Sequence, residues 1–186
     1  MAKIIIRLLD KKDTKQYTTC RLVALKTAPE AFGSDYETTS QKSAEFFEQR
    51  ASFEPENFMV GAFDAGKLIG TVGYYSEQFK NGRHRGNIVG VFLYPTYRGK
   101  GIAQKMFALV IDQVEKTLPH IKQIHLGVAT SNTPAVKLYA SFGFERYGTE
   151  PRSLYVNGDY IDEYLMVRKL DGVTGGTEET RRTTER

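Results

Sequence analysis

The chain has 186 residues, a formal net charge of +4 and 40% hydrophobic residues. These values are typical of one soluble globular domain and exclude an assembly of several domains. No apolar run approaches the roughly 18 residues of a membrane-spanning helix, and the start of the chain lacks the apolar core of a signal peptide, so we expect a cytoplasmic protein. The single cysteine, Cys20, excludes an internal disulfide framework and a Cys-rich metal site.

The first half of the chain predicts a strand, two helices and an antiparallel meander. The β-branched run at residues 4–8 predicts a strand, and Asp13 is a good N-cap for a helix that ends before Pro29. Residues 29–37 are rich in turn formers and predict a loop. A second short helix and three strands follow, at residues 43–52, 58–63, 68–75 and 84–94.

The second half alternates helices with strands. A helical period of apolar residues predicts a helix from Gly101 to just before Pro119. Thr133 and Pro134 predict the N-cap and the first residue of another helix, over residues 135–142. Alternating apolar residues predict a strand at residues 124–128, and two more strands are predicted at residues 153–156 and 160–170, linked by a tight turn at Asn157 and Gly158.

The end of the chain has a different composition. Residues 171–186 contain hardly any apolar side chain and cannot bury enough surface to offset the entropy of ordering. We therefore expect a single domain over residues 1–170, followed by a disordered polar tail.

The positive charge is concentrated between Gln78 and Ile111. This segment contains six Lys and Arg residues and no Asp or Glu, so the rest of the chain has a net charge of −2. Such a segment indicates an anionic partner, either a phosphate-bearing ligand or a nucleic acid. A strand at roughly 3.3 Å per residue separates Arg83 and Arg85 from Arg98 by about 30 Å, so the two ends cannot bind one phosphate. The basic residues are not interleaved with aromatic ones as in a recognisable nucleic-acid module, which disfavours nucleic acid.

Residues 98–103, Arg-Gly-Lys-Gly-Ile-Ala, follow a predicted strand and open a predicted helix. Consecutive backbone amides and the helix dipole at such a junction suit a pyrophosphate, and glycines allow close approach. The segment is neither a Walker loop nor a GxGxxG fingerprint. The alternative is a plain strand-to-helix turn with solvated basic side chains.

A second motif favours the pyrophosphate interpretation. Residues 132–144 spell N-x-x-A-x-x-L-Y-x-x-F-G-F, and together with LYPTYRGKGIA they resemble the GNAT superfamily of acetyl-CoA-dependent N-acetyltransferases, most strongly over residues 88–144. The resemblance implies an α/β (α+β) fold: a mixed, mostly antiparallel central sheet of about seven strands, flanked by about four helices. It also implies acetyl-CoA as cosubstrate.

The resemblance further implies roles for single residues. The coenzyme pyrophosphate would be held by Arg98, Gly99, Lys100, Gly101, Ile102 and Ala103. The pantetheine arm would bond to the backbone of Val91, Phe92 and Leu93, which needs a gap between strands, and Gly90 is a plausible bulge that opens one. Asn132 would contact the same arm, and Tyr139 would lie near the sulfur and protonate the departing thiolate.

The general base is less clear from the sequence. An amine with a pKa of about 10 must lose a proton before it attacks the thioester. Some GNAT enzymes carry a Glu in the strand before the coenzyme loop, but here no carboxylate lies between Glu77 and Asp112. Peptide-acetylating relatives carry a Glu in the next strand, where this chain has Gly127. Both positions that usually hold the base therefore lack a carboxylate. The remaining candidates, acting directly or through water, are Glu37, His84, Asp162 and Glu163.

The favoured function is acetylation of a small-molecule primary amine by direct attack in a ternary complex. Cys20 has no recognisable activating partner and is expected in the core, and the three histidines are not spaced as metal ligands, so no metal is predicted. A protein or peptide acetyltransferase and a non-catalytic acyl-CoA-binding module remain alternatives. No nucleic-acid or membrane partner is expected, and the oligomeric state stays open between a monomer and a homodimer.

Overall fold

The computed structural model describes residues 3–170. Its strands form one seven-stranded sheet with the order β1-β2-β3-β4-β5-β7-β6. The strands are β1 (Ile5–Leu8), β2 (Asn57–Asp64), β3 (Lys67–Ser76), β4 (Arg85–Leu93), β5 (Gln123–Ala129), β6 (Glu145–Val156) and β7 (Asp159–Lys169). Only β4 and β5 pair in parallel, and the other neighbours are antiparallel. The predicted mixed, mostly antiparallel sheet is therefore confirmed, while the predicted tail at 171–186 lies outside the described residues.

The described part of the chain has five α-helices, one more than expected: α1 (Thr14–Thr27), α2 (Tyr36–Ser40), α3 (Ala44–Ala51), α4 (Ile102–Thr117) and α5 (Thr133–Ser141). The additional helix is α2, which begins inside the segment predicted as a loop. It has one turn and too few residues to show an apolar period, but Asp35 caps it by accepting the Thr38 amide at 2.7 Å. No helix among the described residues is long and apolar enough to cross a membrane.

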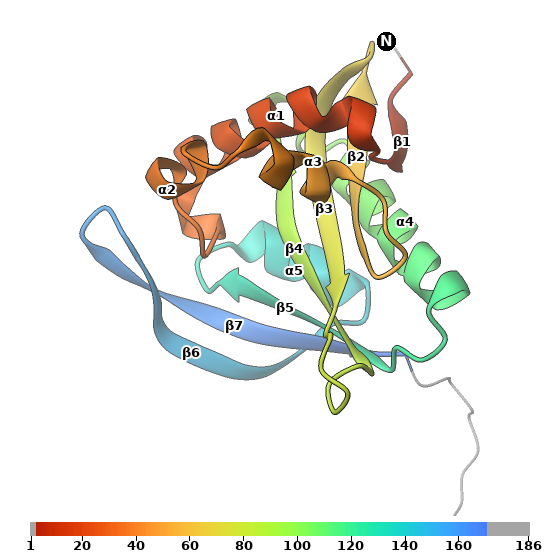
Figure 1. Ribbon diagram of the computed structural model, residues 1–186. Coiled ribbons are helices and arrows are strands. Elements are labelled where there is room, and N and C mark those ends of the chain that lie inside the picture. The colour runs from red at the N-terminus through yellow and green to blue at the C-terminus, as the bar shows by residue number, and fades with distance from the viewer. Residues whose placement is uncertain (1–2, 171–186) are drawn as a thin grey trace, which may run out of the picture.

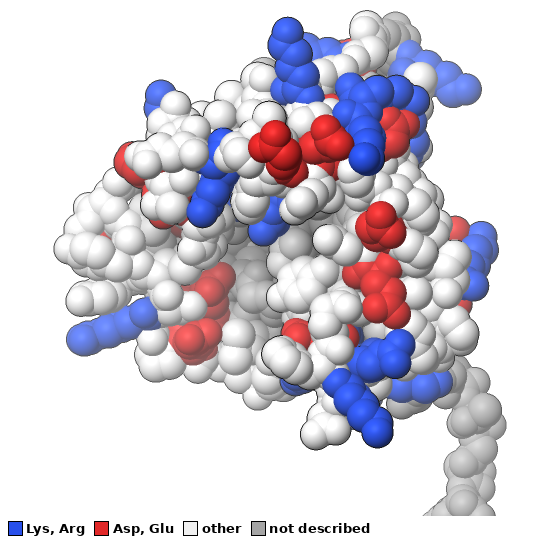
Figure 2. Space-filling model, viewed as in Figure 1, with Lys and Arg blue, Asp and Glu red and all other residues white. Residues whose placement is uncertain are grey.

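Helices cover both faces of the sheet and create two separate cores (Figure 1). Helices α1 and α3 pack on one face, where Tyr17 and Cys20 lie in a buried cluster with strand residues. Helix α4 packs on the other face, where Met106 and Phe107 are completely buried. The space-filling view shows a hollow between the α1–α3 layer and the β6–β7 hairpin (Figure 2). This hollow leads to the candidate site described below.

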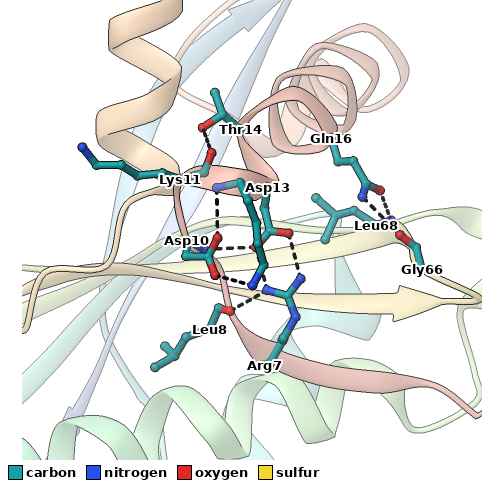
Figure 3. Close-up of polar contacts among 10 residues, drawn as sticks. Arg7, Leu8, Asp10, Lys11, Asp13, Thr14, Gln16, Gly66 and Leu68 are labelled. Carbon is teal, nitrogen blue, oxygen red and sulfur yellow. Dashed lines mark hydrogen bonds and ion pairs between the residues drawn. The ribbon is translucent and has the colours of Figure 1, made fainter.

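The start of α1 differs from the prediction in how Asp13 is used. Asp13 occupies the N-cap position, but its side chain makes no capping hydrogen bond. Its carboxylate instead accepts two bonds from Arg7, at 2.6 and 2.7 Å, and one from the Asp10 amide at 3.0 Å (Figure 3). Gln16 accepts the Leu68 amide at 2.8 Å and so fixes α1 to the β2–β3 hairpin. These contacts place α1 above the sheet.

Strand β6 is much longer than the predicted strand at 153–156, because it begins at Glu145. Its register with β7 shifts after Arg146 and again after Glu150, in the stretch that contains Pro151. A proline cannot donate to a strand ladder and is tolerated on an edge strand or at a bulge. The irregular stretch lacks the alternation of apolar residues that marks a strand, so only the part next to the Asn157–Gly158 turn was predictable.

Candidate active site

Strands β4 and β5 separate in the middle of the sheet. They pair only from Arg85 to Asn87, although β4 continues to Leu93. The expected bulge at Gly90 is present: its φ is +62°, and the β3–β4 register shifts beside it. The hydroxyl of Thr71 donates to the Gly90 carbonyl at 3.0 Å and stabilises this geometry. The bulge turns the rest of β4 away from β5, which leaves the edge of the strand open to a ligand.

A cavity of about 1680 Å³ lies over this opening. Its walls include the separated ends of β4 and β5, the segment that leads into α4, the start of α5 and, on the far side, parts of α1 and α3. The cavity is therefore continuous from the predicted coenzyme site to the hollow under α1.

The loop before α4 has the backbone expected for a phosphate site. Gly99 and Gly101 both have a φ of +72°, in the left-handed region that favours glycine. Within the described residues, the amides of residues 99–103 have no hydrogen-bond partner, as is normal for the first turn of a helix. Arg98 lines the cavity and donates through Nε to the Leu93 carbonyl at 3.0 Å. Lys100 instead lies outside the cavity lining and donates to a loop carbonyl at 2.8 Å.

Helix α5 (Thr133–Ser141) begins one residue earlier than its predicted N-cap implies. Asn132, not Thr133, is the N-cap, and its Oδ1 accepts the Ala135 amide at 3.3 Å. Asn132 and Pro134 both line the cavity. The amide nitrogen of the Asn132 side chain has no partner among the described residues, so it is available to a ligand.

Tyr139 lies on α5 and reaches the same cavity. Its ring packs against Phe107 with centroids 5.0 Å apart, and only 5% of the residue is exposed. Burial raises the pKa of Tyr139 well above its usual value. The phenol therefore keeps its proton at neutral pH.

The four candidate bases lie in very different places. Glu37 is exposed on α2, and His84 is exposed before β4, where its ring lies 3.4 Å from Gln123. Asp162 is exposed and accepts the Arg152 amide at 2.8 Å. None of these three lines the cavity, whereas Glu163 does. The structure thus brings one of the four candidates together with Tyr139.

Glu163 occupies the space above Gly127. A Cβ atom built at Gly127 lies 3.4 Å from Glu163 Oε1. Glu163 pairs with Ala129, so its side chain is on the same face of the sheet as position 127. Ser153 donates to Glu163 Oε2 at 2.6 Å and holds the carboxylate in place. A carboxylate is therefore present where the sequence suggests an empty position, but it comes from the neighbouring strand.

Comparison with known proteins identifies the family. The sequence profile of the Acetyltransferase (GNAT) family matches residues 23–144. The chain belongs to this family. It is an N-acetyltransferase, and GNAT enzymes use acetyl-CoA as the acetyl donor.

Individual GNAT relatives cover most of the chain. It is 25% identical to the L-amino acid N-acetyltransferase AaaT of Escherichia coli over 90% of this chain and 99% of that protein. It is 34% identical to a spermine/spermidine N(1)-acetyltransferase of Bacillus subtilis over 60% of this chain and 69% of that protein. A GNAT acetyltransferase from Streptococcus pneumoniae superimposes with a TM-score of 0.78 at 26% identity, over 90% of this chain and 99% of that one.

Two features of this GNAT site were not found from the sequence. Arg21 and Arg50 line the cavity on the side away from the coenzyme loop, and Ser153 orients Glu163. Nothing distinguishes these side chains from solvated polar residues in the sequence. Cys20 is buried, and burial raises its pKa to about 12, so it remains a thiol and is a poor nucleophile.

Proposed function

We propose that this enzyme acetylates the primary amine of a small molecule by direct attack within a ternary complex. The free amides of residues 99–103 and the side chain of Arg98 would hold the pyrophosphate of the coenzyme. The open edge of β4 at Val91 and Phe92, with Asn132 across the cavity, would hold the pantetheine arm. The carbonyl of Leu93 already accepts a hydrogen bond from Arg98 Nε, so Leu93 would contribute less to binding of the pantetheine arm than the sequence predicts.

The proposed chemistry uses two side chains. Glu163, directly or through water, accepts the proton of the ammonium group, and the free amine attacks the thioester carbonyl carbon. A backbone amide of β4 stabilises the negative charge that develops on the carbonyl oxygen. The C–N bond forms, the C–S bond breaks, and Tyr139 donates its proton to the departing thiolate. The nitrogen, still carrying a positive charge after the attack, loses its second proton, and this proton restores the Tyr139 phenol directly or through water. The products are the amide, the coenzyme A thiol and one proton on Glu163, which passes to solvent.

One observation carries the proposal: the carboxylate of Glu163 lies beside Gly127 in the same cavity as Tyr139. The alternative of a non-catalytic acyl-CoA-binding module depended on a missing base. A carboxylate in this position removes the reason for that alternative.

One structural observation supports a small acceptor over a peptide, whereas the relatives do not distinguish the two, since they include enzymes named for L-amino acids and for spermine and spermidine as well as N-alpha-acetyltransferases. Phe32 is buried against α1, so it holds the segment between α1 and α2 against the acceptor side of the cavity, which this segment lines. A peptide would need this segment to move.

The test is a thiol-release assay with acetyl-CoA and a panel of primary amines. We expect turnover with at least one small amine, and Tyr139→Phe should lower kcat by about 100-fold or more. The same variant should bind coenzyme A within about 3-fold of the wild type by calorimetry, since a ring without the hydroxyl still fills the core. No turnover with any amine despite coenzyme binding would support the non-catalytic module. Equal losses of turnover and affinity would contradict the proton-donor role.

A further inference from the structure

Arg21 is a partly buried cation in the cavity wall without a carboxylate partner. Its Nη2 donates to the Ser34 hydroxyl at 2.6 Å, and its guanidinium lies 4.5 Å from the centre of the Phe32 ring. Its Nη1 is buried and has no hydrogen-bond partner. Burial lowers the pKa of Arg21, as expected for a cation removed from water. A buried charge without a counter-charge is costly, so this arrangement needs an independent reason.

Two other partly buried arginines of this protein each form an ion pair with a carboxylate. Arg7 makes a two-bond ion pair with Asp13. Arg168 lies 2.6 Å from a carboxylate oxygen of Glu115. Both are balanced by a carboxylate of the chain itself, whereas no ion pair involves Arg21 within residues 3–170.

A second guanidinium increases the positive charge around Arg21. Arg50, on α3, is exposed at the mouth of the cavity, with its guanidinium 4.9 Å from the centre of the Phe46 ring. Its charge is one of the factors that lower the pKa of Arg21, so the two groups are close enough to repel each other. Both arginines also border an adjoining recess of about 130 Å³ that Lys42 helps to line. Asp35 also lines this recess, but its carboxylate accepts the Thr38 amide at 2.7 Å, and no ion pair within the described residues joins it to these cations. Three cations against one carboxylate leave the recess with a net positive charge that favours an anion.

The acidic residues of the cavity do not neutralise these arginines. Glu56 lies 3.1 Å from the ring of His120. Glu30 and Glu54 are exposed at the rim, and within the described residues neither forms an ion pair with an arginine. The remaining acid, Glu163, belongs to the opposite wall. In Figure 2 blue side chains reach the edge of the hollow under the α1–α3 layer and red ones lie at its lower edge on the β6–β7 side, although both colours occur on each layer.

From this charge distribution we infer that the acceptor amine carries a carboxylate, as an amino acid does, and that Arg21 binds this carboxylate. Arg50 adds positive charge at the cavity mouth. The inference rests on the proposed function, because it assumes that Glu163 receives the amine at the other end. A planar guanidinium is suited to a carboxylate, to which it donates two parallel hydrogen bonds. A polyamine would instead bring a second ammonium group towards two arginines, which is unfavourable.

The experiment compares acceptors that differ only in charge. We would measure kcat/KM for the twenty L-amino acids, for their methyl esters and for spermidine. The kcat/KM of the best amino acid should be about 10- to 100-fold higher than that of its own methyl ester, which is the range expected for hydrogen bonds to a charged group. Arg21→Met should remove this advantage, mainly through KM, while kcat/KM for the ester changes little. Ser34→Ala is the matched control, since it removes the hydrogen bond to Arg21, keeps the guanidinium and should preserve the preference.

The outcomes separate the two proposals. If the wild type acetylates neither amino acids, esters nor spermidine, the proposed function fails with these acceptors and the carboxylate site fails with it. If esters or spermidine react as efficiently as amino acids, the enzyme acetylates amines but the carboxylate site is wrong. The site is also wrong if Arg21→Met lowers kcat/KM for amino acid and ester equally. Coenzyme A binding by each variant serves as the folding control, and Arg21→Gln, which keeps a polar side chain but removes the charge, replaces Arg21→Met if that variant does not fold.

Discussion

The position of the proton acceptor can be tested by moving it from β7 to β5. Glu163→Gln keeps the size of the side chain and its hydrogen bond with Ser153 but removes the base. A positioned general base contributes about 10²- to 10⁴-fold to the rate, so kcat should fall by about 100-fold or more at neutral pH. In a second variant, Glu163→Ala empties the space above position 127, and adding Gly127→Glu to Glu163→Ala should recover activity to within about 10-fold of the wild type. The reason is geometric, because a Cβ atom at position 127 lies only 3.4 Å from Glu163 Oε1.

The assay is steady-state release of coenzyme A thiol, at saturating acetyl-CoA and with the best acceptor of the panel. Asp162→Asn is the matched control: it makes the same change of charge one residue earlier, on a carboxylate that lies outside the cavity lining. We expect this variant to keep kcat within about 3-fold of the wild type, as is usual for an exposed position. Thermal melting of each variant distinguishes loss of the base from loss of the fold.

Two results would refute this reasoning. If Glu163→Gln retained more than about a third of wild-type kcat, a different group or a water chain would deprotonate the amine. If the double variant folded and bound coenzyme A but stayed inactive, the space above Gly127 would not be the place where the base acts.

Two further predictions concern the fold and the coenzyme loop. Asp13→Asn should lower the free energy of unfolding by about 1–3 kcal/mol at pH 7, because it weakens the ion pair with Arg7. Arg7 lowers the pKa of Asp13, so this stabilisation is present above the unfolded-state pKa and is lost as the pH falls below about 4. Urea denaturation should therefore show the two proteins converging in acid, and a gap independent of pH would contradict the assignment. Gly101→Ala forces a φ of +72° on a residue with a Cβ atom, at a cost of about 1–2 kcal/mol, and calorimetry should show about 10-fold weaker binding of coenzyme A. Gly33→Ala, at an open position without a positive φ, should leave this affinity unchanged.

Much of the fold was predictable because its signals are local. The turn of Asn157 and Gly158 adopts positive φ at both residues, as a two-residue hairpin requires. The bulge at Gly90 could likewise be predicted from one glycine in an apolar strand. In both places a single residue type determines the backbone, so sequence and structure agree.

The errors arose where tertiary contacts decide the local structure. Asp13 was predicted to cap α1, which is its intrinsic preference, but Arg7 on β1 supplies a charged partner and takes the carboxylate. Strand β6 lacks alternation around Pro151, and its pairing with β7 supplies the order that its sequence does not. Such contacts join residues whose neighbourhood is not visible along the chain.

The base illustrates the same limit at the site. The sequence left the base open among four candidates, Glu163 included, because a sequence pattern follows one strand at a time and Gly127 lies between two apolar residues of its strand. A sheet, however, places residues of neighbouring strands on one face, and the β5–β7 register sets Glu163 beside Ala129. The missing side chain at position 127 is what gives the Glu163 carboxylate its room, because a larger residue there would occupy the same space. The glycine and the glutamate therefore form one functional unit, so each position needs to be judged together with the other.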